Sequence, residues 1–137
     1  MARYSQWVTG VDACRTAIDD ARINAARAEL ANLNFRMGIA HKALVRVFQT
    51  GARFDRVFLH GMRRPFGPRA MAVIRAIKPE KVVYIGPSSR SLAEDMDGLP
   101  EYAMTRLGGL DQTPGTTTIL NVALMERTMS GYPAPID

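Results

Sequence analysis

Apart from the carboxylates, few side chains in this sequence could do nucleophilic, acid–base or metal chemistry near neutral pH. They are one cysteine, Cys14, and two histidines, His41 and His60. A single thiol excludes an internal disulfide and a cysteine-based zinc cluster, and the two histidines lack the spacing of metal ligands. His60 could act as an acid or base, but the sequence shows no third group to orient it. We therefore favour an ordinary loop histidine over a catalytic one.

Arginines are the second group of candidate residues, because the net charge of +5 is unevenly divided along the chain. Residues 1–50 carry +3, residues 53–81 carry +6 and residues 82–137 carry −4. A basic middle with an acidic end favours contact with a polyanion on one face. Arg63, Arg64 and Arg69 are the candidates for phosphate contacts, since guanidinium groups grip phosphate oxygens in pairs. Plain solvation of the surface by these arginines is an equally weighted alternative.

A turn rich in serine is a further candidate anion site. The run Gly86-Pro87-Ser88-Ser89 leads into a predicted helix, and helix N-termini attract anions. Helix capping alone explains the serines and is our first choice. The run Ser91-Leu92-Ala93-Glu94 has the spacing of a capping box, which predicts that the helix begins there.

Alternating strands and helices must position these residues. Apolar periodicity and Gly/Pro punctuation predict strands over 8–11, 34–37, 56–59, 81–85, 102–107 and 117–125, and helices over 13–31, 41–49, 69–77 and from about 91 to 98. The continuous β-branched run 81–85 is typical of a parallel strand covered on both faces. The last two strands have no helix between them, which predicts an antiparallel hairpin. The order indicates an α/β, doubly wound, Rossmann-like fold over residues 1–128, followed by a flexible tail over 129–137.

Length and composition place the chain among ordinary soluble domains. It has 137 residues, 47% of them hydrophobic, so one domain with a useful core is expected. No apolar run approaches the length of about 20 residues that spans a membrane, and the start lacks the apolar region of a signal peptide. We therefore expect a cytoplasmic protein without a membrane partner. Trp7 and Tyr84, each beside a predicted strand, are interpreted as core aromatics.

Several runs of this sequence resemble the class I S-adenosylmethionine-dependent methyltransferases. More narrowly, they are similar to the catalytic domain of the RNA uracil-5-methyltransferases, over nearly all of residues 7–127. The runs are Phe54-Asp55-Arg56-Val57-Phe58-Leu59, Val82-Val83-Tyr84-Ile85, Leu92-Ala93-Glu94-Asp95, Gln112-Thr113-Pro114 and Val122-Ala123-Leu124-Met125-Glu126-Arg127. The resemblance implies a mostly parallel sheet that ends in the antiparallel hairpin.

The resemblance also implies a cofactor site, of which only half is present. In the family, a first strand and a glycine-rich turn approach the methionine part of the cofactor. Too few residues precede Val8 to supply them, so we expect the first strand to be missing. The acid that binds the ribose hydroxyls corresponds to Asp12, and the acid near the adenine corresponds to Ile39. S-adenosylmethionine is thus a possible ligand, with binding expected to be weak or absent.

The catalytic residues of that family are replaced in this sequence. Methylation of uracil C5 needs a thiolate that adds to C6 and a base that later removes the C5 proton. Pro87 stands where the resemblance puts the nucleophilic cysteine, and Thr117 where it puts the base. The family's Asp-Pro-Pro-Arg turn corresponds to the run from His60 to Arg63, which keeps only the arginine. Cys14 is interpreted as a packing residue rather than a substitute nucleophile.

Three functions follow from these observations. The first is a methyltransferase-like protein that has lost catalysis and binds RNA or protein, with RNA held by segment 53–81. The second is an active methyltransferase whose missing strand comes from another chain or an upstream segment. The third is an interaction module that forms a homo-oligomer or binds a partner chain in place of that strand.

Overall fold

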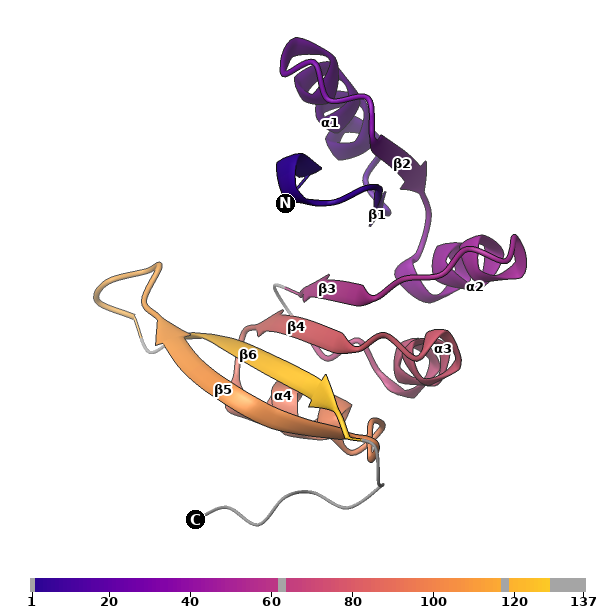
Figure 1. Ribbon diagram of the computed structural model, residues 1–137. Coiled ribbons are helices and arrows are strands. Elements are labelled where there is room, and N and C mark those ends of the chain that lie inside the picture. Colours follow the sequence, from indigo (N-terminus) through magenta and orange to yellow (C-terminus); the bar gives the residue numbers. More distant parts are fainter. Residues whose placement is uncertain (1, 62–63, 117–118, 129–137) are drawn as a thin grey trace. The chain divides into compact units, whose positions relative to one another are not determined.

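The computed structural model describes residues 2–61, 64–116 and 119–128 (Figure 1). Its elements follow the predicted order of strands and helices, which confirms the α/β class. The chain divides into two compact units, residues 1–52 and residues 53–137, and each is described by itself. Arg63, Thr117 and the tail 129–137 lie outside the described residues. The prediction of a single domain over 1–128 stays a prediction.

The first unit is a β-α-β-α segment. Its two strands pair in parallel and in register over their whole length. The elements are the short 3-10 helix η1 (Ala2–Tyr4), β1 (Val8–Asp12), α1 (Arg15–Arg27), β2 (Leu33–Met37) and α2 (Ala40–Gln49).

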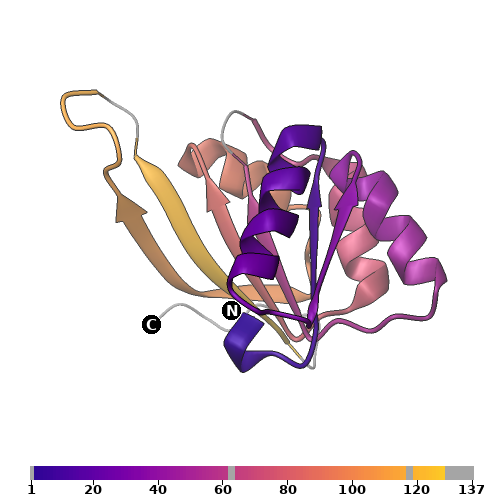
Figure 2. The ribbon, with the colours of Figure 1, turned by 90° about the horizontal axis from the view of Figure 1, so that it is seen from above.

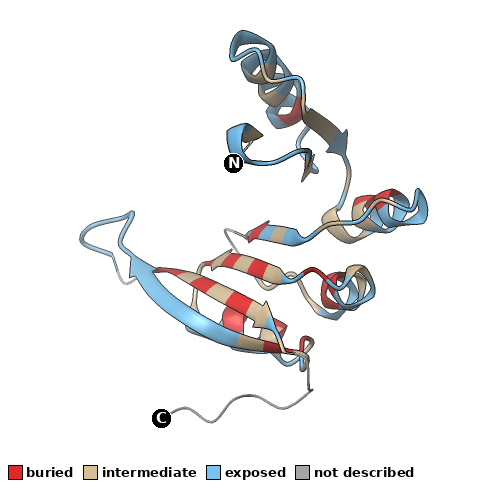
Figure 3. Cartoon of the chain, in the orientation of Figure 1, coloured by how far each residue is buried: buried red, intermediate tan, exposed pale blue. Residues whose placement is uncertain are grey.

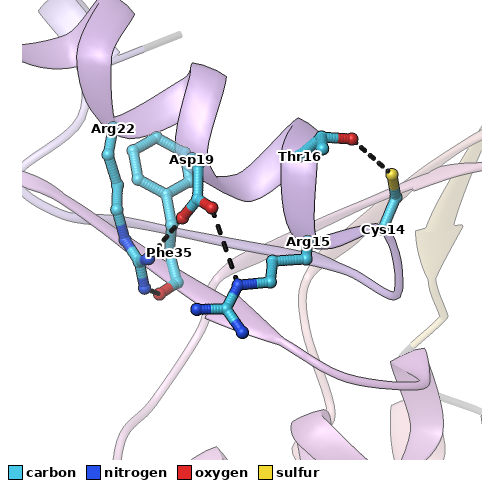
Figure 4. Close-up of polar contacts among 6 residues, drawn as sticks. All are labelled: Cys14, Arg15, Thr16, Asp19, Arg22 and Phe35. Carbon is cyan, nitrogen blue, oxygen red and sulfur yellow. Dashed lines mark hydrogen bonds and ion pairs between the residues drawn. The ribbon is translucent and has the colours of Figure 1, made fainter.

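Polar contacts tie α1 to β2. The Arg22 guanidinium donates hydrogen bonds to the Asp19 carboxylate at 3.1 Å and to the carbonyl oxygen of Phe35 at 3.2 Å (Figure 4). The apolar part of this unit is small, since among its described hydrophobic residues only Ile18, Ala43 and Val47 are buried. The unit therefore depends on backbone pairing and these polar contacts as well as on packing.

The second unit is a four-stranded mixed sheet with two helices. Its strand order is β3-β4-β6-β5, in which β3 and β4 are parallel and the other two pairs are antiparallel. The predicted C-terminal hairpin is thereby confirmed. The elements are β3 (Arg56–His60), α3 (Pro68–Ile77), β4 (Lys81–Gly86), α4 (Ser89–Met96), β5 (Tyr102–Leu110) and β6 (Leu120–Arg127).

The core of this unit lies between one face of the sheet and both helices. Buried residues alternate along β4 and β6, as the banding of these two strands shows (Figure 3). The buried cluster consists of Leu59, Ala70, Met71, Ile74, Val82, Tyr84, Leu92, Leu99, Tyr102, Ala123 and Met125. Because α3 and α4 both contribute to this cluster, both cover the same face of the sheet.

Residues 111–116, which follow β5, extend past the ends of β3 and β4 (Figures 1 and 2). Every residue of β5 from Met104 to Leu110 is exposed. Leu107 and Leu110 are 56% and 48% exposed, although they are large and apolar. This part of β5 therefore has no share in the core.

Some predicted boundaries were wrong for physical reasons. α1 ends at Arg27 rather than near residue 31, and two residues later Glu29 adopts a left-handed conformation with φ of 54°. α4 begins earlier than the predicted capping box, because the Ser88 hydroxyl caps it by accepting a hydrogen bond of 3.2 Å from the backbone N–H of Ser91.

The expectation for the two aromatics was half right. Tyr84 is fully buried, which confirms it as a core residue, whereas Trp7 is 56% exposed, so its assignment to the core was wrong. Trp7 precedes β1 in the small first unit, whose few buried side chains offer little apolar surface to cover an indole. Among the described residues, no helix is long and apolar enough to cross a membrane.

Candidate functional site

The carboxyl ends of β3 and β4 bring two of the predicted site positions side by side. His60 is the last residue of β3 and pairs with Ile85, two residues before Pro87. The N–H of Gly61 extends the pairing with a hydrogen bond of 2.9 Å to the carbonyl oxygen of Ile85. In open α/β sheets ligands bind at this edge, where the strand ends meet the loops. His60 and Pro87 thus lie where a substrate would approach.

Hydroxyl and amide groups line the turn that follows β4. The Ser88 hydroxyl caps α4 and lies 3.0 Å from the hydroxyl of Ser91. The Ser89 hydroxyl donates a hydrogen bond of 3.1 Å to the side-chain oxygen of Asn121, which lies opposite Gly86 on β6. Capping, which we ranked first for the serines, is therefore the role that Ser88 has. Sequence reasoning missed Asn121, because only the strand pairing reveals its position.

Gly86 is required by close packing at the end of β4. A Cβ atom at this position would overlap the ring of Tyr84. A side chain larger than hydrogen would therefore displace either the tyrosine or the turn that carries Pro87.

A buried carboxylate holds the loop between β3 and α3. Asp95 is 1% exposed, and its two oxygens accept hydrogen bonds from the backbone N–H groups of Phe66 and Gly67, at 2.9 and 2.8 Å. The same carboxylate accepts a third hydrogen bond from the phenol of Tyr84 at 2.9 Å. Burial raises the pKa of the Tyr84 phenol, and its hydrogen bond to Asp95 raises it further. Asp95 is a second residue that sequence reasoning missed.

Two of the three predicted phosphate-binding arginines, Arg64 and Arg69, are at the surface; Arg63 lies outside the described residues. Arg64 lies in the loop between β3 and α3, Arg69 lies in the first turn of α3, and both are exposed. Neither makes an ion pair with another described residue, so both guanidinium groups are available to an anion. The Asp95 carboxylate already accepts hydrogen bonds from the N–H groups of Phe66 and Gly67, just before α3. A phosphate there would therefore be held by side chains rather than by those backbone groups.

In the first unit, the two predicted cofactor positions also meet at strand ends. Asp12 ends β1, and its carbonyl oxygen accepts a hydrogen bond of 2.9 Å from the N–H of Gly38, the residue before Ile39. Ile39 is the N-cap residue directly before α2 and is 54% exposed. One oxygen of the Asp12 carboxylate accepts a hydrogen bond of 2.7 Å from the N–H of Cys14. The other oxygen has no hydrogen bond within the described residues, so it could accept one from a ribose hydroxyl, and the exposed Ile39 could cover an adenine.

Cys14 lies next to Asp12 at the start of α1. Its sulfur is 3.1 Å from the hydroxyl of Thr16 (Figure 4). This hydrogen bond lowers the pKa of the Cys14 thiol, and a hydrogen bond from the backbone of Ala17 lowers it further. Cys14 is exposed, so our interpretation of it as a packing residue was wrong. A search of the described residues finds no group of His, Cys, Asp and Glu that could hold a metal ion.

Comparison with known proteins relates this arrangement to the RNA methyltransferases. No protein-family model matches the chain. In an alignment of 127 positions that covers 91% of this chain, it is 32% identical to an uncharacterized RNA methyltransferase of Listeria monocytogenes serotype 4b. The chain spans only 28% of the length of that relative. The predicted relationship to RNA methyltransferases is therefore confirmed for this segment.

Solved structures confirm the methyltransferase fold. The tRNA (uracil-54, C5)-methyltransferase of Pyrococcus abyssi, in complex with S-adenosyl-L-homocysteine, superimposes with a TM-score of 0.75 and 24% identity, over 90% of this chain and 30% of that chain. TrmK of M. capricolum, in complex with S-adenosyl-homocysteine, gives a TM-score of 0.69 at 10% identity, over 96% of this chain and 55% of that chain. At these identities the likeness concerns the fold alone.

Proposed function

We propose that this chain, a relative of one segment of the RNA methyltransferases, is a methyltransferase-like module that binds RNA and does not methylate uracil. One observation carries the loss of catalysis. Pro87, at the position that corresponds to the nucleophilic cysteine, directly follows β4 at the edge where His60 ends β3. Proline has no group that can add to C6 of a pyrimidine.

The neighbouring groups are poor substitutes for the missing thiolate. The Ser88 hydroxyl caps α4, and the Ser89 hydroxyl donates to Asn121. Neither has a hydrogen bond to a base among the described residues, and a serine that lacks one is a weak nucleophile. His60 is exposed, and its imidazole has no hydrogen bond within the described part of the chain. It therefore lacks the orienting group that a general base requires.

The basic segment 53–81 supports binding to RNA. It carries a charge of +6, and Arg64 and Arg69 on its surface are not engaged by carboxylates of the described residues. Contacts of this kind with phosphates are independent of base sequence and release counterions, so RNA affinity should fall as salt rises. Segment 53–81 would thus hold the RNA backbone without reading its sequence.

Asp12 carries the cofactor part of this proposal. S-adenosylmethionine, when bound, supplies the methyl group. Asp12 would hold the ribose hydroxyls through its carboxylate, while Ile39 would pack on the adenine. Because the described residues of the first unit offer only this half of a cofactor site, we expect weak binding.

The RNA-binding proposal is tested by charge removal at matched positions. The double variant Arg64→Gln/Arg69→Gln should bind a single-stranded polyuridylate probe more weakly. Its slope of log affinity against log salt should be smaller by about 1.4, since each phosphate contact contributes about 0.7 for single strands. The control Arg27→Gln/Arg46→Gln removes the same charge from exposed positions outside the basic segment. Equal losses in both double variants would contradict a site on segment 53–81.

The loss of catalysis is tested with a labelled cofactor. Purified protein mixed with uridine-containing RNA and S-adenosylmethionine labelled in its methyl group should give no 5-methyluridine. Product formation that disappears in Pro87→Ala would overturn the proposal, because it would place the chemistry at this turn.

An active methyltransferase is the second candidate function. It is favoured by the fold shared with enzymes solved in complex with S-adenosyl-homocysteine and by the position of Asp12 at the end of β1. A missing strand would then come from another chain or an upstream segment. A ligand at 100 times its Kd stabilises the folded state by about 2.7 kcal/mol, so S-adenosylmethionine should raise the melting temperature of the wild type but not of Asp12→Asn. The absence of a shift at millimolar cofactor would exclude this candidate.

A further inference from the structure

The chain between the two exposed candidate arginines has little conformational freedom. Its sequence is Arg64-Pro65-Phe66-Gly67-Pro68-Arg69, and Pro68 is the first residue of α3. Each proline ring fixes one backbone φ angle and also restricts the residue before it to extended conformations. Gly67 has φ of 82°, in the range that favours glycine. Few backbone rotations therefore separate the two guanidinium groups.

The aromatic side chain in the middle of this run packs against the core of the second unit. The Phe66 ring meets the Tyr84 ring edge to face, with 5.8 Å between the ring centroids and 77° between the ring planes. A Cβ atom at Gly61 would lie 3.0 Å from the Phe66 ring, so that ring also packs closely on the backbone. Phe66 thus anchors the run from the inside, while Arg64 and Arg69 are exposed.

Asp95 fixes the backbone at the same point. Its two oxygens accept hydrogen bonds from the N–H groups of Phe66 at 2.9 Å and of Gly67 at 2.8 Å. Asp95 is 1% exposed and has no lysine or arginine partner among the described residues. A buried carboxylate without a cation is unfavourable in an apolar core, where an aliphatic side chain would pack at lower cost. The backbone that Asp95 holds accounts for its presence there.

We propose that Asp95 is a positioning residue for RNA binding, because its hydrogen bonds to the backbone of Phe66 and Gly67 hold Arg64 and Arg69 in place to grip phosphates. Asp95 itself is buried and does not contact the RNA. This inference rests on the proposed binding of RNA by segment 53–81 and adds the residue that organises the site. Two guanidinium groups that are already ordered bind more tightly than mobile ones, since less conformational freedom is lost on binding.

Two effects of Asp95 on RNA affinity have opposite signs. Its negative charge lies close to the site and repels phosphates, so removal of the charge alone should strengthen binding. Loss of its hydrogen bonds frees the backbone between the arginines and should weaken binding. Asp95→Asn changes both, and the positioning role predicts that weaker binding prevails. Glu94→Gln removes a charge from the exposed neighbouring residue and measures the charge effect alone, so its affinity should equal or exceed that of the wild type.

A double-mutant cycle tests the positioning role. The affinity for polyuridylate is measured at a temperature at which circular dichroism shows every variant to be folded. Asp95→Asn should weaken binding by about fivefold or more, because two arginine side chains must then be ordered on binding. In the background Arg64→Gln/Arg69→Gln, the same substitution should change the affinity by less than about twofold, since no guanidinium group remains to be placed.

Tyr84→Phe is the matched control for stability. It removes the third hydrogen bond to Asp95 and weakens the same core, but it keeps the ring that packs on Phe66 and both backbone hydrogen bonds of the carboxylate. The affinity of Tyr84→Phe for polyuridylate should therefore equal that of the wild type. Similar losses of affinity in Tyr84→Phe and Asp95→Asn would reject the positioning role, because affinity would then follow stability.

The outcomes separate this inference from the function on which it rests. An equal loss of affinity from Asp95→Asn with and without the two arginines would reject the positioning role and leave RNA binding by segment 53–81 intact. Tighter binding by Asp95→Asn would have the same meaning, because only the charge effect would remain. An Arg64→Gln/Arg69→Gln variant that binds polyuridylate as the wild type does would reject the RNA site and this inference together.

If Asp95→Asn fails to fold, amide hydrogen exchange of the wild type decides the question. The N–H groups of Phe66 and Gly67 should be protected in the free chain as strongly as in its complex with polyuridylate. Rapid exchange of both in the free chain, followed by protection when polyuridylate binds, would overturn the proposal, because the RNA rather than Asp95 would then order the backbone between the arginines.

Discussion

The phenol of Tyr84 donates a hydrogen bond of 2.9 Å to Asp95, and both side chains are buried. Asp95 has no lysine or arginine partner among the described residues, so its charge is stabilised by three hydrogen-bond donors alone. The other two donors are backbone N–H groups of the loop before α3. One carboxylate thus links β4, α4 and the loop that carries Arg64.

Removal of the Asp95 charge should destabilise the second unit. In Asp95→Asn, one backbone N–H of Phe66 or Gly67 would face an amide NH₂ and lose its acceptor. A buried donor without a partner costs about 1–3 kcal/mol, so the free energy of unfolding should fall by that amount. Urea denaturation measures it.

Two variants control for this effect. Glu94→Gln removes the same charge from the exposed neighbouring residue and should leave the midpoint of urea denaturation unchanged. Tyr84→Phe removes one hydrogen bond of the three and should cost about 1 kcal/mol, less than Asp95→Asn. Equal stability of wild type and Asp95→Asn would show that the loop is held by other contacts.

A methyl group at Gly86 should also lower the free energy of unfolding. In Gly86→Ala the new Cβ overlaps the Tyr84 ring, so the buried tyrosine must shift and its hydrogen bond to Asp95 must stretch. Overpacking of this kind costs about 1–3 kcal/mol. The control is Gly108→Ala on β5, where a Cβ meets nothing within 4 Å. Similar midpoints for the two variants in urea would contradict the close packing described for Gly86.

Much of the fold could be predicted because local patterns determine it. The β-branched run of β4 and the absence of a helix between β5 and β6 indicated a parallel strand and a hairpin. The placement of His60 near Pro87 followed as well, since the carboxyl ends of neighbouring parallel strands meet at one edge.

Asn121 and Asp95 could not be found in the same way. Asn121 reaches Ser89 only through the register of β4 with β6, and strand register depends on pairing between distant residues. Asp95 looks like an ordinary helix acid in sequence. Its one available signal was its spacing from Leu92, three residues earlier on the buried face of α4.

At acid pH, the ion pair between Arg75 and Glu101 should lose its contribution to stability. Two guanidinium nitrogens of Arg75 donate to one Glu101 oxygen, at 3.0 and 2.6 Å, and these hydrogen bonds lower the pKa of that carboxyl. Because the pKa is lower in the folded state, the stabilisation is present above the unfolded value of about 4.3 and disappears as pH falls through the folded value. Arg75→Gln should therefore be less stable than the wild type at neutral pH and equal to it in acid. If the free energies of unfolding of Arg75→Gln and the wild type differ by the same amount at neutral and acid pH, the pairing of Arg75 with Glu101 is contradicted.

At alkaline pH, ionisation of Tyr102 should lower the free energy of unfolding. Its phenol donates a hydrogen bond of 2.7 Å to the carbonyl oxygen of Pro79, and burial raises its pKa to about 12. A phenol whose folded-state pKa is raised contributes stability below its unfolded value of about 10, and this contribution is lost as pH rises toward the folded value. The free energy of unfolding should thus decline between these values, and less steeply in Tyr102→Phe. Absorbance titration should show the phenol of Tyr102 ionising only as the pH approaches about 12.

The thiol of Cys14 should react less readily once Thr16 cannot donate to it. The Thr16 hydroxyl lies 3.1 Å from the sulfur and is the main cause of the lowered pKa of Cys14. Thr16→Val keeps the shape of the side chain but removes this donor, so the thiolate loses stabilisation and its pKa should rise. The pH at half-maximal alkylation by iodoacetamide should then shift upward, whereas Thr113→Val, in the second unit, should leave it unchanged. An unshifted midpoint in Thr16→Val would assign the lowered pKa to the backbone N–H groups at the start of α1, the remaining donors near this sulfur.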